Sequence, residues 1–426
     1  MPALPDSLGV LRERDYRLLF GAQAVSLLGD GMVNVALAFA VIGLGGGAPE
    51  IGLVFTLRAV ALVVCVLAGG VVGDRLPRRA VLISADLVRV ASQGAIAVAL
   101  IAGEPAFWVI GALSAVSGAA TGFFNPTSTA FLPAVVSAEG LQPANALRGL
   151  LSSVGRIGGP SLAGLLVVTA GAGWALAVDA ATFALSAALL SRIRTSDQPV
   201  PATKSFLADM KEGWDAFRSR TWLWTFVAWF SFGNLLYGCW AVVGPLVAER
   251  DLGGAGAWGL IIAASGAGGV VGGVLALRVK PRRPLLFASL NASIFLLPLA
   301  VLALGPPAAL IAAVAVVSEI GAVLALSVWE STLQRYVEPA TLSRVSAYDW
   351  FGSLAFLPVG LAVWGPIADA IGYDNALWLA FGLHVASVVP LLAVRAVRTL
   401  PALPPGPPAA TGAAAGSTSS TATRPP

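Results

Sequence analysis

Apolar stretches of about twenty residues recur along almost the whole chain. Clear examples are 53–72, 80–102, 222–248 and 285–304. Each stretch is long enough to cross the hydrocarbon core of a bilayer as a helix. Only 11% of the residues are charged and 57% are hydrophobic, whereas a soluble globular protein carries about 25% charged residues. The chain is therefore predicted to be an all-α, polytopic integral membrane protein.

Breaks at glycine, proline and charged residues divide the sequence into about twelve apolar spans. Their extents are 17–43, 50–73, 80–102, 105–124, 145–170, 173–192, 222–248, 256–278, 284–304, 307–330, 345–368 and 374–396. With this division the arginines and lysines between spans gather in the loops of one side, while the opposite loops hold a single basic residue, Arg250. By the positive-inside rule, both termini are predicted to be cytoplasmic, in a multi-pass protein of the inner (cytoplasmic) membrane.

The residues that build metal and disulfide sites are scarce. Only Cys65, Cys239 and the single histidine His384 are present, all in apolar spans. No disulfide framework, metal site or cofactor is therefore expected. The formal charge of +4 is spread over many loops, which excludes a nucleic-acid-binding domain. The predicted partners are a small-molecule substrate, protons and the lipid bilayer, and we expect a monomer.

A polar segment divides the chain in the middle, with half of the spans on each side. The predicted parts are an N-terminal six-helix bundle, a cytoplasmic linker, a C-terminal six-helix bundle and a disordered cytoplasmic tail, at 1–194, 195–220, 221–398 and 399–426. The tail is of low complexity. The linker is predicted to end in an amphipathic surface helix, because it has apolar residues at helical spacing. These residues are Phe206, Met210, Trp214 and Phe217.

The two halves carry related turns. "GGVVGDRLPRR" at 69–79, after the second span, has a counterpart after the eighth span in "GGVLALRVKPRR" at 272–283. Similar motifs at corresponding places in two halves indicate an internal duplication, which is the plan expected of a secondary transporter.

The first of these turns resembles the cytoplasmic signature G-x-x-x-D-R-x-G-R-R of the major facilitator superfamily. The matching residues are Gly70, Asp74, Arg75, Arg78 and Arg79, and Pro77 replaces the second glycine. The stretches "LGDG", "NPTSTAFLPAVV" and "LQPANAL" resemble the branch that contains the enterobactin exporter and macrolide-efflux proteins. The resemblance covers 8–398 and implies twelve helices in two rocking bundles.

The resemblance also implies that this turn is a cytoplasmic latch. Such a latch pairs with the other half when the carrier is open outward and separates when it opens inward. The alternative is that the arginines only set the topology, as Arg78 and Arg79 do in either case. Because an isolated acid adds nothing to orientation, Asp74 and Arg75 favour the latch.

"GRIGGPSLAG" at 155–164 resembles the antiporter signature G-x-x-x-G-P-x-x-G-G. The matching residues are Gly155, Gly159, Pro160 and Gly164. Small residues at intervals of about four are expected to line one helix face and to pack closely, and the proline to bend the helix. The resemblance implies export, whereas the alternative is the ordinary glycine content of membrane helices.

Several ionisable residues lie within spans: Asp30, Arg58, Asp86, Arg89, Arg156, Asp179 and Glu319. A charge at the bilayer centre costs about 2.5–3.5 kcal/mol, so each is expected to face a partner or a wet cavity. Because burial disfavours the charged form of a carboxylate, Asp30 and Glu319 are the candidates for loading and releasing protons.

These candidates have structural alternatives. Asp30 is equally well explained as the partner of Arg58 or Arg89. Asp86 is spaced for an i,i+3 pair with Arg89 and is interpreted as structural. Arg156 either faces the cavity or neutralises Asp30.

Aromatic residues within the spans are candidates for a surface on which a planar hydrophobic substrate stacks. They are Phe123, Phe124, Trp229, Phe232, Tyr237, Trp240 and Trp329. Contact with lipid or with the membrane interface explains any single one equally well.

These features predict a secondary transporter that exports an amphiphilic small molecule such as a drug, an antibiotic or a secondary metabolite by proton antiport with alternating access. One alternative is a carrier of siderophores, metabolites or lysophospholipids with other coupling, and another is a non-transporting membrane sensor or scaffold. An enzyme is not expected, because paired carboxylates, nucleotide loops and metal clusters are missing at usable spacing in the sequence.

Overall fold

The computed structural model describes residues 6–137, 141–194, 206–276, 278–337 and 339–401. The N-terminal half contains η1 (Asp6–Arg12), α1 (Arg14–Gly43), α2 (Ala48–Arg75), α3 (Arg78–Ala102), α4 (Phe107–Val135), α5 (Leu141–Ala170) and α6 (Ala172–Leu190). The helix α7 (Phe206–Arg218) follows in the linker.

The C-terminal half begins with α8 (Thr221–Val247) and a π-helical turn, η2 (Ala248–Leu252). It continues with α9 (Ala255–Ala276), α10 (Pro284–Ala292), α11 (Leu297–Ala303), α12 (Ala308–Tyr336), α13 (Pro339–Leu354), α14 (Leu357–Ile371), α15 (Tyr373–Ala393) and α16 (Arg395–Thr399).

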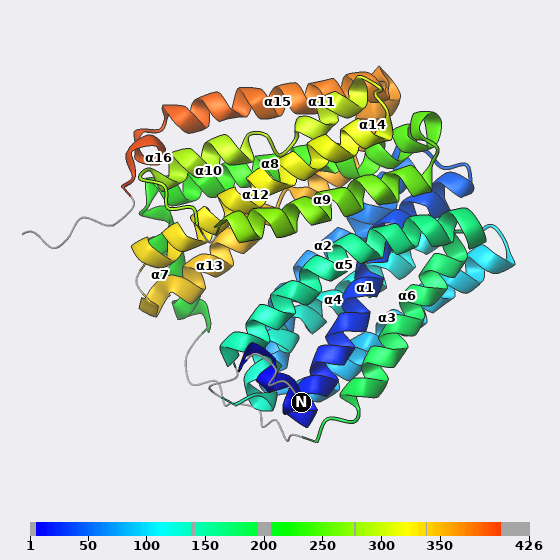
Figure 1. Ribbon diagram of the computed structural model, residues 1–426, viewed down its shortest axis with the longest axis horizontal. Helices are drawn as coiled ribbons and strands as arrows, with labels where there is room; N and C mark the ends of the chain where they lie inside the picture. Colours follow the sequence, from blue (N-terminus) through cyan, green and yellow to red (C-terminus); the bar gives the residue numbers. More distant parts are fainter. Residues whose placement is uncertain (1–5, 138–140, 195–205, 277, 338, 402–426) are drawn as a thin grey trace, which may run out of the picture.

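The described residues form 12 helical segments that are long and apolar enough to cross a membrane. This number and the all-α class agree with the prediction. Figure 1 shows α1–α6 gathered into one bundle, the N bundle, and α8–α15 into a second, the C bundle. The exact domain boundaries stay a prediction, because 195–205 and 402–426 lie outside the described residues.

Two spans that the sequence predicted as continuous helices are interrupted. The ninth consists of α10 and α11, and the eleventh of α13 and α14. Pro298 and Pro358 each lie in the first turn of the second piece. A proline has no N–H to donate and its ring clashes with the carbonyl four residues earlier, so a helix restarts at it more easily than it continues through it.

The bundles meet along two helix pairs, α5 with α9 and α2 with α14. Glycines bring these backbones close together. A Cβ atom on Gly164 would lie 2.8 Å from the carbonyl oxygen of Ala255, and one on Gly52 would lie 2.6 Å from that of Leu361. Small residues at helix crossings are the usual means of close packing in membranes.

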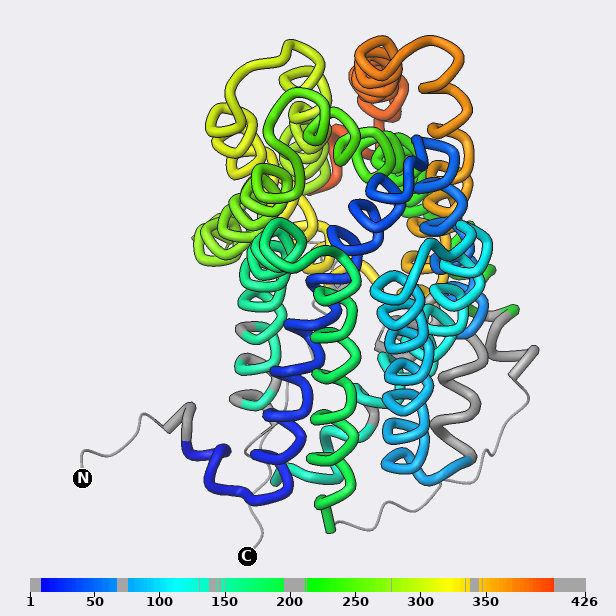
Figure 2. Tube along the Cα trace, turned by 90° about the vertical axis from the view of Figure 1, so that its right-hand side faces the viewer, coloured from blue at the N-terminus to red at the C-terminus, as the bar shows by residue number. Residues whose placement is uncertain are grey.

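These contacts lie toward one end of the molecule. We call the end with the loops after α2, α4, α6, α9, α12 and α15 the basic end, because it carries most of the arginines and lysines. The close α5–α9 and α2–α14 contacts lie toward the opposite end. Figure 1 shows the bundles approaching each other there and diverging toward α7 and α16. Figure 2 looks at the molecule from the right-hand side of Figure 1, the end where the bundles meet, and shows most of the N bundle below the C bundle.

The two bundles have different interiors. The N bundle buries polar groups, among them Asp86, Arg89, Gln93 and Asp179. The C bundle buries aromatic rings near its basic end, where Phe226 and Trp329 stack with ring centroids 4.6 Å apart.

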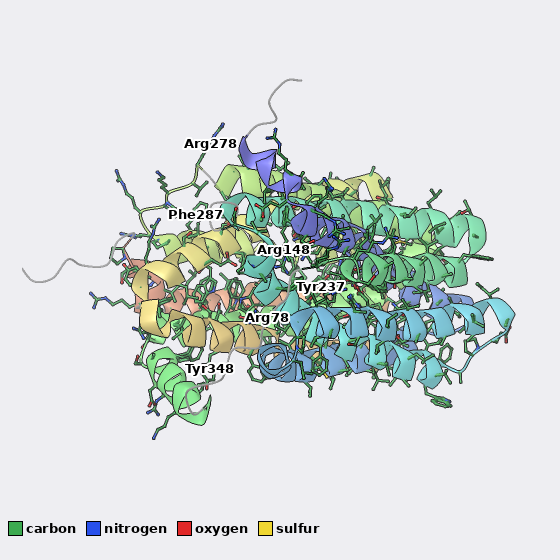
Figure 3. The ribbon with its side chains drawn as sticks, turned by 90° about the horizontal axis from the view of Figure 1, so that it is seen from below. Arg78, Arg148, Tyr237, Arg278, Phe287 and Tyr348 are labelled. Carbon is green, nitrogen blue, oxygen red and sulfur yellow. The ribbon has the colours of Figure 1, made fainter. Side chains whose placement is uncertain are left out.

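The helix α7 packs against the C bundle. The rings of Trp214 and Phe217 lie 5.4 Å and 6.0 Å from that of Tyr348 in α13, and Figure 3 shows Tyr348 beside α7. Trp214 remains half-exposed, as expected for an amphipathic helix at a membrane surface.

A cavity and two charge sites between and within the bundles

A cavity of about 670 Å³ lies between the two bundles. The N bundle lines it with residues of α1, α2 and α5, and the C bundle with residues of α8, α9, α11, α12 and α14. We call it the central cavity. Its volume falls in the range of about 300–1,000 Å³ that suits drug-sized ligands.

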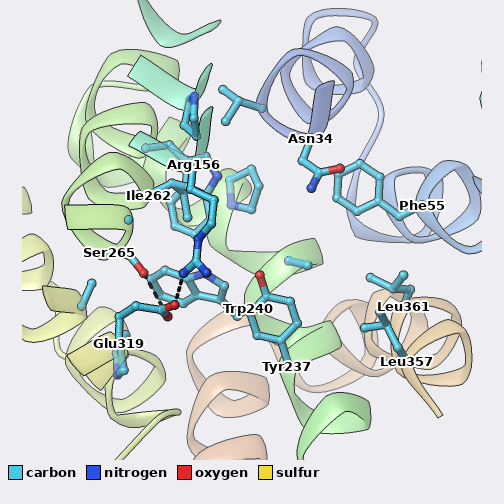
Figure 4. Close-up of a pocket in the computed structure, with 18 of the residues that line it drawn as sticks. Asn34, Phe55, Arg156, Tyr237, Trp240, Ile262, Ser265, Glu319, Leu357 and Leu361 are labelled. Atoms are coloured by element: carbon cyan, nitrogen blue, oxygen red, sulfur yellow. Dashed lines mark hydrogen bonds and ion pairs between the residues drawn. The ribbon is translucent and has the colours of Figure 1, made fainter. Parts of the chain in front are cut away.

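An ion pair crosses the central cavity from one bundle to the other. The Arg156 guanidinium of α5 donates to the Glu319 carboxylate of α12, and Ser265 Oγ of α9 lies 3.4 Å from Glu319 Oε2. Figure 4 shows the three side chains converging. The partners are 163 positions apart in the chain. Arg156 was expected either to face the cavity or to neutralise Asp30. In the structure it faces the cavity and pairs with Glu319.

Aromatic rings surround this ion pair. Two of the predicted substrate-surface residues, Tyr237 and Trp240, line the cavity. They pair with aromatic residues that sequence reasoning missed. The ring of Tyr237 stacks on Phe295 at 5.7 Å between centroids, and Trp240 lies 4.7 Å from Trp258. Phe55 contributes from the N bundle (Figure 4).

A signal for one missed residue was present in the sequence. Trp258, Ile262 and Ser265 follow one another at helical spacing on α9 and share the face that lines the cavity. Phe295, in contrast, lies in the break between α10 and α11. Outside a helix, helical spacing does not predict which way a side chain points. Its place in the wall follows from the tertiary structure.

The other predicted aromatics lie outside the cavity lining. Phe123, Phe232, Phe124, Trp229 and Trp329 are all absent from it. Trp229 and Trp329 belong to the aromatic core of the C bundle, where their Nε1 atoms donate to Ser387 Oγ at 2.9 Å and to Asp349 Oδ2 at 3.0 Å. Phe124 is buried in the N bundle against the Arg89 guanidinium, 4.3 Å from its ring centroid. These large rings are needed to fill the bundle interiors.

A second charge site lies inside the N bundle, centred on Arg89. Its guanidinium donates to Asp86 and lies 3.3 Å from Asp30 Oδ2. It is also held between the rings of Phe124 and Phe183. Arg58 of α2 lies 3.9 Å from the other oxygen of Asp30. Both arginines that were expected as partners of Asp30 therefore lie within ion-pair distance of it. The expected i,i+3 pair of Asp86 with Arg89 is also present.

Two further helices complete this site. Ser186 Oγ of α6 donates to Asp86 Oδ2 at 2.7 Å, and Gln93 Nε2 of α3 donates to Asp179 Oδ2 at 2.8 Å. We call the set of Asp30, Arg58, Asp86, Arg89, Gln93, Asp179 and Ser186 the N-bundle cluster. It ties α1, α2, α3 and α6 together. Asp30 and Arg58 also line the central cavity, so the cluster reaches the cavity on one side.

The small residues of the antiporter-like motif lie on two faces of α5, not on one as predicted. Cβ atoms on Gly155 and Gly159 would lie 2.7 Å from Leu27 O and 2.6 Å from Gly31 Cα of α1, inside the N bundle. Gly164 instead faces α9 in the other bundle. Nine residues at about 100° each amount to two and a half turns, which places Gly164 opposite Gly155. Pro160 lines the cavity.

The turn at 69–79 joins α2 to α3 at the basic end. Arg79 Nε donates to Leu190 O at 3.1 Å, which ties α3 to the end of α6 within the N bundle. Arg78 begins α3. Gly70, Asp74 and Arg75 belong to the last turns of α2, but their surroundings lie outside the described part of the chain.

In the described part of the chain, twelve helical segments long and apolar enough to cross a membrane form two bundles around the central cavity. This is the architecture of a secondary transporter. The family model described as Major Facilitator Superfamily matches residues 19–351. The chain belongs to the Major Facilitator Superfamily, a family of membrane transporters, as the signature at 69–79 predicted.

Curated relatives support the predicted branch. The chain is 30% identical over 198 residues to the enterobactin exporter EntS of Salmonella paratyphi A, a match that covers 45% of this chain and 47% of that protein. The chain thus spans about half the length of that relative. It is 23% identical over 388 residues to macrolide efflux protein A of Streptococcus pyogenes, covering 88% of this chain and 95% of the relative.

Solved transporters share the fold. A peptide transporter POT in complex with sulfate superposes with a TM-score of 0.73 at 11% identity, over 93% of this chain and 100% of that one. The nucleoside transporter NupG superposes with a TM-score of 0.72 at 14% identity, over 89% and 98%. At these identities the likeness concerns the fold alone.

Proposed function

We propose that this protein exports an amphiphilic small molecule in exchange for protons. The observation that carries the proposal is the central cavity, which combines an aromatic wall with an ion pair that joins the two bundles. Tyr237, Trp240 and Trp258 suit the apolar part of such a substrate, and the charges of Arg156 and Glu319 suit its polar part. The names of the relatives, one an exporter and one an efflux protein, favour outward transport.

The test is efflux from cells. Cells that express the protein should accumulate less of some dyes or antibiotics from a broad panel than cells without it. A proton uncoupler should abolish the difference, because antiport is driven by the proton gradient. Efflux that survives the uncoupler would contradict proton coupling, and unchanged accumulation of every compound would contradict export of this substrate class.

Glu319 is the coupling carboxylate that we favour. Its partner Arg156 belongs to the other bundle, so a rocking motion of the bundles changes their separation. Asp30 meets Arg58 and Arg89, all within the N bundle. That pairing persists when the N bundle moves as one body. A carboxylate that loses its cation during the cycle is able to take up a proton at that point.

Asp30→Asn separates the two candidates. If Asp30 is the coupling group, this substitution stops uphill efflux in reconstituted vesicles while energy-independent exchange persists. If Glu319 is the coupling group, Asp30→Asn still pumps uphill with a normal pH dependence. The loss of both activities would assign Asp30 a structural role toward Arg89.

We propose that the basic end faces the cytoplasm and that the bundles therefore diverge toward the cytoplasm in this conformation. Cysteines introduced at Gly46 and Gly254, in a background with Cys65 and Cys239 replaced by serine, should react with a membrane-impermeant reagent added outside. Ser205 and the C-terminal tail should not react. Labelling of Ser205 from outside would overturn the orientation.

We also propose that Asp74 belongs to a latch at the basic end, which closes when the carrier opens outward. Asp74→Asn should leave membrane insertion unchanged and slow transport. The substitution removes a pair that only the outward-open conformation makes, so the exchange between the two conformations changes. Full turnover by this variant at normal membrane levels would contradict the latch.

A further inference from the structure

The N-bundle cluster contains more acids than bases. Three carboxylates, Asp30, Asp86 and Asp179, share two guanidiniums, those of Arg58 and Arg89. With every group ionised, these five described side chains would carry one uncompensated negative charge. An isolated carboxylate is too costly to keep in an apolar interior, and the group takes up a proton instead.

The contacts show which carboxylate lacks a cation. Asp86 and Asp30 both lie within ion-pair distance of Arg89, and Asp30 also of Arg58. Among the described residues no arginine or lysine lies within 4.0 Å of Asp179. Its Oδ2 accepts from Gln93, and its Oδ1 is buried without a hydrogen-bond partner. The Asp179 side chain is fully buried.

The charged and polar groups that face Asp179 come from three helices, α1, α2 and α3. The helix α3 contributes Arg89 and the neutral Gln93, α1 contributes Asp30, and α2 contributes Arg58.

The charges of α5 point elsewhere. Its Arg148 donates to Thr129 and its Arg156 to Glu319. The charge balance around Asp179 is therefore set by the N-bundle cluster.

We propose that Asp179 is a proton-binding site, that it is protonated in this conformation, and that it exchanges its proton with the central cavity past Asp30. Asp179 Oδ1 lies against the bare backbone of Gly29, where an added Cβ atom would be 2.5 Å from it. Gly29 directly precedes Asp30, which lines the cavity. The backbone of α1 at Gly29 and Asp30 thus lies between Asp179 and the cavity.

Arg58 is the group that responds when the proton leaves. Its Nη1 is buried without a hydrogen-bond partner, its contact with Asp30 is long at 3.9 Å, and it interacts electrostatically with both Asp30 and Asp179. When the O–H bond of Asp179 breaks and the proton passes to cavity water, the new carboxylate attracts Arg58. Asp30 then keeps Arg89 alone and presents more negative charge to the cavity.

Infrared spectroscopy of the purified protein tests this proposal directly. A protonated carboxylic acid has a carbonyl-stretch band that an ionised carboxylate lacks. We expect such a band in the wild-type protein, its loss in Asp179→Asn, and its decline in the wild type as the pH is raised. Asp349→Asn is the matched control. Asp349 is also a buried carboxylate, but it lies in the C bundle, so the band of Asp179 should remain in that variant.

A second variant covers the case in which Asp179→Asn does not fold. Gln93→Leu removes the amide that donates to Asp179 Oδ2, so the carbonyl band should shift while its intensity remains. The proposal is overturned if the band survives Asp179→Asn, if Gln93→Leu leaves its position unchanged, or if its intensity is constant at all pH values. Constant intensity would mean a permanently neutral structural acid.

The role of this proton in transport rests on the proposed antiport, whereas the infrared band does not. A titrating Asp179 band in a protein without uphill efflux would count against the antiport alone. Uncoupler-sensitive efflux with no such band would count against Asp179 alone.

Discussion

The N-bundle cluster and the Arg156–Glu319 pair are both built from arginines and carboxylates, but they differ in burial and in connectivity. Asp86 and Arg89 have no exposed side-chain surface, whereas Arg156 is 51% exposed and Glu319 14% exposed. The cluster joins helices of one bundle, and the pair joins two bundles. A buried network holds a rigid body together, while a pair that bridges moving bodies reports their relative position. Substitutions in the two sites should therefore affect different properties.

The largest effect is expected when Arg89 is removed. Arg89→Leu leaves Asp86 as a buried charge without its cation, which costs about 3–5 kcal/mol of folding stability. Arg156→Leu is the matched variant, and it should cost no more than about 1 kcal/mol because the pair is partly exposed. Unfolding of the two purified variants in detergent measures this difference. Equal losses would contradict the distinction between the two sites.

The next largest effect concerns two glycines. A Cβ atom on Gly31 would lie 2.4 Å from Gly155 O within the N bundle, and one on Gly164 would lie 2.8 Å from Ala255 O across the bundles. Gly31→Ala should cost about 1–3 kcal/mol through overpacking.

Gly164→Ala should instead push the bundles apart at the end where they meet, with a smaller loss of stability. Unfolding measurements and distances between spin labels on α5 and α9 distinguish the outcomes. If Gly164→Ala destabilises the fold as much as Gly31→Ala, the bundles do not separate as independent bodies.

Loss of the inter-bundle pair should affect transport more than stability. If the bundles rock as proposed, Glu319→Gln removes an interaction that only one conformation makes. Coupling of this kind corresponds to about 1–3 kcal/mol, or at least about a fivefold change. We expect a loss of uphill efflux of that size in vesicles, with energy-independent exchange retained. The exchanged double variant, Arg156→Glu with Glu319→Arg, should recover pairing but not proton coupling. Unchanged uphill efflux in Glu319→Gln would remove the coupling role from this residue.

The smallest effects are expected from two serines. Ser186 Oγ donates to Asp86 at 2.7 Å in a buried place, so Ser186→Ala should cost about 1 kcal/mol of stability. Ser265 Oγ lies 3.4 Å from Glu319 Oε2, beside the cavity. Because this contact is long, Ser265→Ala should change neither unfolding nor efflux measurably. A clear loss of efflux in Ser265→Ala would assign Ser265 to the substrate or proton path.

The sequence by itself determined the number of spans, the all-α class and the family. These properties depend on local features: the length of each apolar run, the charges that flank it and a signature confined to 69–79. The pair of Asp86 with Arg89 could also be predicted from the sequence, because a spacing of three places both side chains on one face of a helix. The sequence also shows the prolines at which the ninth and eleventh spans are interrupted. Proline alone, however, did not distinguish a break from the positions of Pro160 and Pro245, where the helix continues through the proline.

Only the tertiary structure decided which charges meet and which aromatic rings line the cavity. Arg156 and Glu319 belong to different halves, and no local period relates them. Tyr237 and Trp240 line the cavity while Trp229, on the same helix, fills the core of the C bundle. In an apolar helix that is surrounded by helices and lipid, hydrophobicity is similar on every face, so the pattern does not reveal its rotation. Packing against neighbouring helices sets the rotation of each helix. That rotation decides which side chains form the charge sites and line the cavity.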